Sequence, residues 1–295
     1  MKDRLRACGD DGSAVALAVG ARAALRAIPL LEYLEWDKPP RKRMRPSVGR
    51  QRMSKDDIVL GCFRSAATAW VAAMFPAFGA SERFHGIKHA ARLAGGAEHA
   101  GKSPANAVGA ATHATMMATI SLVDKFRIFI DGREAAPGEH CAIMASHAAA
   151  IAAHGFMRAY DRQAAEQLFA NARDLDWIAN RELSASERAV WDAARKDVQL
   201  WKDARDTQAL LAQPLWLAGV PSYAQEDWRK LVARLRGRTD ERWEVWIDWY
   251  EARLAGRRDV SEHDEIARVS LADDVWALGA AAVNASIAGQ TVAQR

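Results

Sequence analysis

The chain has 295 residues and a formal net charge of +4, and half of its residues are apolar. This balance is typical of a globular protein that is long enough to bury a sizeable core. Its three cysteines, Cys8, Cys62 and Cys141, are too few and too scattered for a disulfide framework or a cysteine-rich zinc site, which favours a cytoplasmic protein. Arg22 cuts short the apolar run at residues 14–21, so we expect no signal peptide and no transmembrane helix.

Helix start and stop signals recur along the whole chain. Pro29 is expected to kink or end an alanine-rich helix near the N-terminus, with a short continuation over residues 30–36. Gly237 and Gly256 are expected to end two later helices. The residues suited to begin helices are Asp56 or Asp57, Ser103, Ser184, Ser222, Asp240, Ser261 and Asp273. Residues 126–130 favour a short strand, but no second run is marked as its hairpin partner. The sequence therefore predicts an all-α, bundle-like protein.

The composition changes near residue 160. The first part, residues 1–160, is rich in alanine and contains seven of the eight histidines. The second part, residues 161–295, contains nine of the eleven tryptophans. We interpret these parts as two helical halves that can share one core.

Residues 38–55 form a basic arm with eight Lys or Arg residues, three prolines and no acidic residue. This composition is typical of a solvated linker, which is the simplest interpretation. It also suits contacts with nucleic acid phosphates or with an acidic protein surface. The candidate contact residues are Lys38, Arg41, Lys42, Arg43, Arg45, Arg50 and Arg52.

Residues 240–256 predict a tryptophan-rich helix with distinct faces. Trp243, Trp246 and Tyr250 fall on one apolar face at the helical period. Beside that face, four residues of the same helix form a candidate binding surface: Trp249, Glu244, Asp248 and Glu251. The simpler interpretation is a core helix with a solvated acidic side. The alternative is that Trp249 and the acidic stripe bind a partner, because tryptophan is enriched at interfaces.

Two groups of histidines have regular spacing. His85 and His89 lie one helical turn apart, the spacing at which two imidazoles can bind one metal ion, although Gly86 stands where a zinc protease has glutamate. A second series places a histidine at every seventh position: His140, His147 and His154. Such positions share one helix face but are too far apart to bind a single ion, so they favour a contact between helices.

Several segments resemble those of a known group of proteins. They are A-R-A-A-L-R-A-I-P-L-L (21–31), C-F-R-S-A-A-T-A-W-V-A-A-M-F-P (62–76), Q-P-L-W (213–216), W-E-V-W-I-D-W-Y-E-A-R-L-A-G (243–256) and W-A-L-G-A-A-A-V-N-A-S-I (276–287). Together they resemble an uncharacterised alphaproteobacterial, often rhizobial, family with an alanine-rich helical middle and a tryptophan-rich end. The resemblance carries over no catalytic or binding residue, because the family has no established activity.

The leading functional hypothesis is a non-catalytic cytoplasmic interaction or scaffold protein. The sequence contains no nucleophile elbow, phosphate loop or dinucleotide fingerprint, and we expect no cofactor. Under this hypothesis the protein binds a protein partner or another copy of itself, and no membrane. Two alternatives remain: nucleic acid binding through the basic arm, and metal-dependent hydrolysis at His85 and His89.

Overall fold

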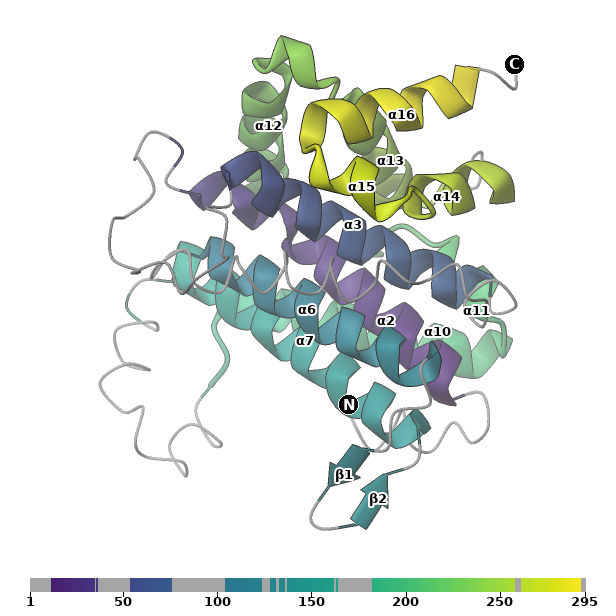
Figure 1. Cartoon of the computed structure of the whole chain (residues 1–295). Helices are drawn as coiled ribbons and strands as arrows, with labels where there is room; N and C mark the ends of the chain where they lie inside the picture. Colours follow the sequence, from purple (N-terminus) through teal and green to yellow (C-terminus); the bar gives the residue numbers. More distant parts are fainter. Residues whose placement is uncertain are drawn as a thin grey trace, which may run out of the picture.

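The computed structural model describes residues 12–34, 36, 54–75, 104–123, 128–130, 133–135, 137–161, 163, 182–257 and 261–292. Apart from one small hairpin, the regular secondary structure of these residues is helical (Figure 1). The prediction of an all-α, bundle-like protein is therefore confirmed.

Helix α2 (Gly12–Ala27) lies at the centre of the described structure (Figure 1). It packs against α3 (Lys55–Met74), α6 (Ala105–Val123), α7 (Pro137–Tyr160) and α10 (Ala185–Ala204). Its small side chains allow the close approach of four neighbours, and its side chains are buried from its first full turn to its end. An alanine-rich sequence thus gives a fully surrounded helix because alanine favours helix formation and occupies little space.

At Pro29 the chain continues from α2 into a 3₁₀ helix, η2 (Ile28–Tyr33). The proline lies in the first turn of this helix, where its missing N–H group leaves no hydrogen bond unmade. Of the two outcomes expected at Pro29, a kink or an end of the first helix, the structure shows the end, at Ala27.

The C-terminal elements begin with α11 (Thr207–Leu211) and continue with α12 (Ser222–Arg236), η4 (Thr239–Glu241), α13 (Glu244–Ala255), α14 (Glu262–Val269), α15 (Asp273–Ala277) and α16 (Ala280–Val292). Helices α13 to α16 lie on the side of α3 that faces away from α6 and α7, whereas α11 lies beside α10 (Figure 1). Helices α14 and α16 contact α3, whereas α12 contacts η2. One hydrophobic cluster runs through both parts of the chain, from Val15 to Ile287. The division at residue 160 stays a prediction.

Several helix ends agree with the sequence. Ser184 and Glu187 form the reciprocal hydrogen bonds of a capping box, and Ser261 caps α14. Helix α3 begins slightly earlier than expected, because Ser54 forms a capping box with Asp57. Helix α12 does begin at Ser222, but no side-chain hydrogen bond caps it. Ser103 lies outside the described residues.

Three local predictions are wrong. Helix α13 begins at Glu244 and not at Asp240, because the left-handed residue Arg242, with φ 50°, separates it from η4. The sequence predicts one continuous helical segment from Asp273 through residues 275–287, but the structure divides it at Gly279, which has φ 88°. A hairpin is also present: β1 (Ile128–Ile130) pairs antiparallel with β2 (Arg133–Ala135). The strands are joined by the sequence Asp-Gly, which is typical of two-residue hairpin connections.

Candidate functional site

Two of the predicted sites fall outside the described residues. They are the basic-arm residues Lys38, Arg41, Lys42, Arg43, Arg45, Arg50 and Arg52, and the histidines His85 and His89. Within the described ranges, no group of three or more His, Cys, Asp or Glu side chains is arranged to hold a metal ion. Nucleic acid binding by the arm and metal binding by the two histidines stay predictions.

The candidate surface on α13 differs from its prediction at Trp249. This side chain is only 2% exposed, and its indole N–H donates a hydrogen bond of 3.0 Å to Glu265 of α14. Helix α14 covers this side of α13, so the prediction of an exposed edge at Trp249 is wrong. Glu244 and Asp248 are exposed, whereas Glu251 is half-buried and accepts a hydrogen bond from Trp228. Of the predicted surface, only Glu244 and Asp248 are therefore fully exposed to solvent.

The centre of the fold contains a charged cluster that the sequence analysis missed. Arg22 Nε lies 3.0 Å from Asp197 Oδ1, and Arg26 Nη2 lies 2.7 Å from Asp197 Oδ2. All three side chains are fully buried. Burial lowers the pKa of Arg22 to about 10, with Asp197 opposing this effect. The cluster places two cations and one anion where water does not solvate them, so they need other polar partners.

Backbone carbonyl groups supply those partners. Arg22 donates to the carbonyl oxygens of Leu210, Gln213 and Pro214 at 3.2, 2.7 and 2.6 Å. Arg26 donates twice to Leu215, at 2.8 and 2.6 Å. These carbonyls lie at and just after the C-terminal end of α11, and their oxygens accept the charged donors in place of water. The cluster therefore attaches α2 to α10 and to the segment after α11.

Further arginines connect the C-terminal helices. Arg253 forms a buried ion pair with Glu265, and its guanidinium lies 5.2 Å from the ring centre of Trp70. Arg268 donates a hydrogen bond of 2.7 Å to the carbonyl of Val245. These interactions join α14 to α13, and α13 to α3. These buried arginines could be mistaken for active-site residues, but their ion pairs and hydrogen bonds are made within the fold.

The five segments that carry the family resemblance meet in this core. Residues 21–31 contribute Arg22 and Arg26, whose guanidinium groups bind the carbonyls of residues 213–215. A Cβ atom at Gly256 would lie 2.5 Å from the backbone nitrogen of Pro214, so glycine allows α13 to end against the same segment. Trp246 stacks on Phe63 at 5.5 Å and donates a hydrogen bond to Asn284 at 2.7 Å. These segments therefore hold the fold together.

The histidines of α7 have different surroundings. His140 is buried, His147 is exposed and His154 is half-buried. Burial lowers the pKa of His140, and His147 contributes to the same shift. Because His147 faces solvent, the three do not form one continuous contact between helices.

An apolar surface lies at the C-terminal helices. Leu278 is 73% exposed, the only large hydrophobic side chain in the described part of the chain that is exposed. It precedes α16, whose outer face presents the small residues Ala281, Ala285 and Gly289 to solvent. No charged residue occurs between Val275 and Gln294. The structure thus places one large apolar side chain beside an uncharged helix face.

Among the residues that the structure describes, two helices are long and apolar enough to cross a membrane by length and composition. They lie within Ser13–Tyr33 and Lys55–Met74, and 94% and 89% of the most apolar stretch of each is buried inside the fold. Buried core helices of soluble proteins share these properties, so this finding is weak evidence for a membrane protein. The absence of membrane association stays a prediction.

No family model matches the chain, and neither does any curated protein or solved structure.

Proposed function

We propose that this protein is a non-catalytic helical interaction protein, which associates with a second copy of itself through Leu278 and the outer face of α16. The observation that carries this proposal is the exposure of Leu278 beside an uncharged helix face. Burial of a leucine side chain contributes about 1.5–3 kcal/mol relative to leaving it exposed to water. Association of two copies would remove this surface from water.

The α16 face is suited to pairing with itself. Its outward residues are small, so two such helices can approach closely, and a Cβ atom at Gly289 would have no neighbour within 4 Å. The absence of charge means that a symmetric contact brings no like charges together. Figure 1 shows α16 on the outside of the described structure, with no other described helix covering it.

Light scattering coupled to size-exclusion chromatography tests this proposal. We expect the mass of the wild-type protein to rise above that of a monomer with concentration, and the Leu278→Glu variant to remain monomeric. A matched control is Gln225→Glu, which adds the same charge at an exposed position of α12 and should associate like the wild type. A wild-type protein that stays monomeric at all concentrations, or equal masses for both variants, would contradict the proposal.

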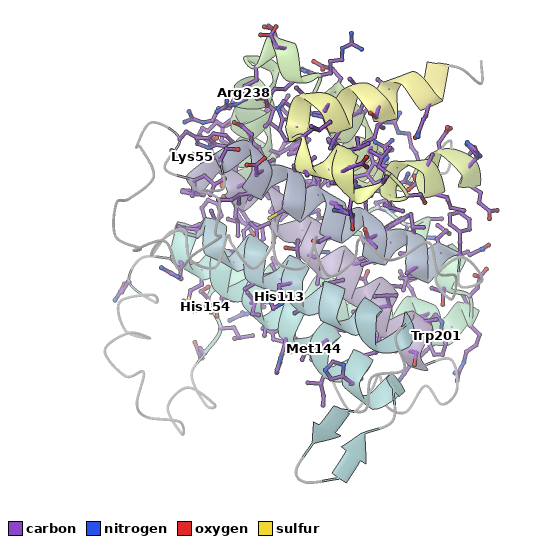
Figure 2. All side chains as sticks on the ribbon, viewed as in Figure 1. Lys55, His113, Met144, His154, Trp201 and Arg238 are labelled. Atoms are coloured by element: carbon purple, nitrogen blue, oxygen red, sulfur yellow. The ribbon has the colours of Figure 1, made fainter. Side chains whose placement is uncertain are left out.

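Nucleic acid binding through the basic arm is a second proposal, and the surroundings of Arg238 favour it. The Arg238 guanidinium lies 5.4 Å from the ring centre of Trp36 and its Nε lies 3.0 Å from Asp56. Arg238 thus connects residues that precede and follow the basic arm. Lys55 and Arg238 are seen at the same end of the molecule in Figure 2. Trp36 and Asp56, which flank the arm in the sequence, therefore lie near the C-terminal end of α12, whose last turn contains Arg234 and Arg236.

Fluorescence anisotropy with a labelled DNA duplex and a labelled single strand, at low and high salt, tests this second proposal. A quadruple variant with glutamine in place of Arg41, Lys42, Arg43 and Arg45 should bind more weakly and with a smaller salt dependence. The control replaces four cations of α10 with glutamine: Arg188, Arg195, Lys196 and Lys202. If both quadruple variants bind alike, the arm has no specific part in binding.

A further inference from the structure

Asp227 of α12 joins three elements through one carboxyl group. Its side chain is 3% exposed and accepts a hydrogen bond from the hydroxyl of Tyr160, the last residue of α7. It also accepts a hydrogen bond from the hydroxyl of Tyr33 in η2. The contact between α12 and the rest of the fold therefore includes a buried acid with two phenol partners.

Aromatic rings surround these hydrogen bonds. Tyr160 lies 4.5 Å from Tyr223 and 6.4 Å from Tyr33 between ring centres, and Phe156 stacks on Tyr160 at 6.0 Å. The rings limit the access of water to Asp227. An ionised carboxylate in such surroundings loses hydration that two phenol hydroxyls replace only in part.

The charged groups around Asp227 do not neutralise it. Within its own helix, Lys230 favours the ionised form, but its ammonium lies 3.5 Å from Glu226. From η2, Glu32 favours the neutral form and is itself paired with Arg234 at 2.8 Å. Just after α7, Asp161 helps to raise the pKa of the neighbouring Tyr223 hydroxyl and accepts a hydrogen bond from Ser186 of α10. Among the described residues, Asp227 has no ion-pair partner.

We propose that Asp227 is a proton-controlled contact, which holds α12 firmly against η2 and the end of α7 when its carboxyl is protonated and weakens this docking when it is ionised. The protonated group can donate a hydrogen bond to one tyrosine oxygen while it accepts one from the other hydroxyl. The ionised group can only accept, and it places an uncompensated charge among the rings. Docking of α12 therefore depends on pH.

The pH range follows from the burial of the carboxyl. Burial raises the pKa of Asp227 to about 6, although the hydrogen bond from Tyr33 and the charge of Lys230 oppose the shift. When α12 is undocked, the same group has an ordinary aspartate pKa of about 3.9. Docking is therefore strongest below about pH 4, weakens as pH rises to about 6, and is constant above that. The docking equilibrium should change by at most roughly 100-fold across this range.

Hydrogen exchange measured by mass spectrometry tests the proposal, after correction for the intrinsic pH dependence of exchange. In the wild type, we expect protection of the residues of α12 to decrease between pH 4 and pH 6.5. In Asp227→Asn, protection should not change in this range, because the side chain cannot ionise. Asp203→Asn, at an exposed carboxylate of α10, serves as the control and should behave like the wild type. Protection of α12 that is independent of pH in the wild type, or equal pH dependence in Asp227→Asn, would overturn the proposal.

A second variant keeps the test decisive if Asp227→Asn does not fold. Tyr160→Phe retains the ring and removes one hydroxyl that stabilises the ionised carboxylate. The midpoint of the change in α12 protection should then move to higher pH, because the ionised form has lost a hydrogen bond. A purely structural role for Tyr160 would lower protection equally at every pH without moving the midpoint, and that result would also overturn the proposal.

Discussion

Arg22 of α2 and Asp197 of α10 form an ion pair of 3.0 Å in which both side chains are fully buried. Arg26 shares the same carboxylate, so one anion is in contact with two buried cations. The other hydrogen bonds of the arginines go to carbonyl groups at the end of α11 and in the segment after it. This arrangement makes Asp197 the only acidic partner of two arginines in the middle of the described fold.

Replacement of Asp197 by alanine should destabilise the protein by about 3–5 kcal/mol, because it leaves two buried cations without their anion. Urea unfolding followed by circular dichroism measures this change. Asp203→Ala is the matched control, since Asp203 lies in the same helix with an exposed side chain, and it should alter stability by about 0.5 kcal/mol or less. Equal effects of the two replacements would contradict the structural role of Asp197.

Alanine substitutions at two glycines distinguish the cost of a positive φ from the gain in helix propensity, both measured as a change in stability. Gly256 has φ 70°, and a Cβ atom there would lie 2.5 Å from a backbone atom of Pro214, so Gly256→Ala should cost more than about 1 kcal/mol. Gly289 lies within α16 with open space around it, so Gly289→Ala should stabilise the protein by about 0.5–1 kcal/mol. Thermal unfolding should show shifts of opposite sign.

Two serines at helix starts give a similar comparison. Ser184 accepts the capping hydrogen bond of α10, whereas the side chain of Ser222 caps nothing at the start of α12. Ser184→Ala should cost about 0.5–2 kcal/mol in free energy of unfolding. Ser222→Ala should have an effect of only a few tenths of a kcal/mol, since alanine is favourable in a first turn. Comparable losses in both variants would show that the capping bond is not the cause.

The pH dependence of global stability provides a further prediction at Asp227. Because its pKa in the folded protein, about 6, exceeds its unfolded value, the stability that this group provides is complete below about pH 4 and is lost as pH rises to about 6. Relative to the wild type, Asp227→Asn should therefore gain about 1–2 kcal/mol between pH 4 and pH 7, less than the unscreened maximum. Urea unfolding at several pH values gives this difference. A difference that does not vary with pH would exclude ionisation of Asp227 as its source.

Local signals in the sequence predict much of the helical framework. Ser184 with Glu187 and Gly256 each mark a helix end through interactions with residues a few positions away, and the structure confirms them. Such signals depend on the backbone near the residue itself. They are therefore readable without knowledge of the tertiary fold.

The candidate sites depend on contacts between residues that lie far apart in the sequence. Arg22 is conspicuous only as a charge within an apolar run, and its partner Asp197 lies in a distant helix of the other half. The spacing of Arg22 and Arg26 does place them on one face of α2, which is a usable but nonspecific signal. Similarly, the periodicity of α13 cannot show that α14 covers Trp249. Periodicity describes one helix, whereas burial depends on its neighbours.

Trp249 and Leu278 offer the most direct test of which surface is free. Trp249 is 2% exposed and hydrogen-bonded to Glu265, so Trp249→Ala should destabilise the protein by about 3–5 kcal/mol through a cavity and an unpaired carboxylate oxygen. Leu278→Ala removes a side chain that is 73% exposed and should change the stability of the monomer by about 0.5 kcal/mol or less. Chemical unfolding at low protein concentration, where association is weak, measures both effects. If Trp249→Ala is as mild as Leu278→Ala, Trp249 is accessible and becomes a candidate contact again. If Leu278→Ala leaves the stability of the monomer unchanged, loss of association in Leu278→Glu can be attributed to the surface and not to unfolding.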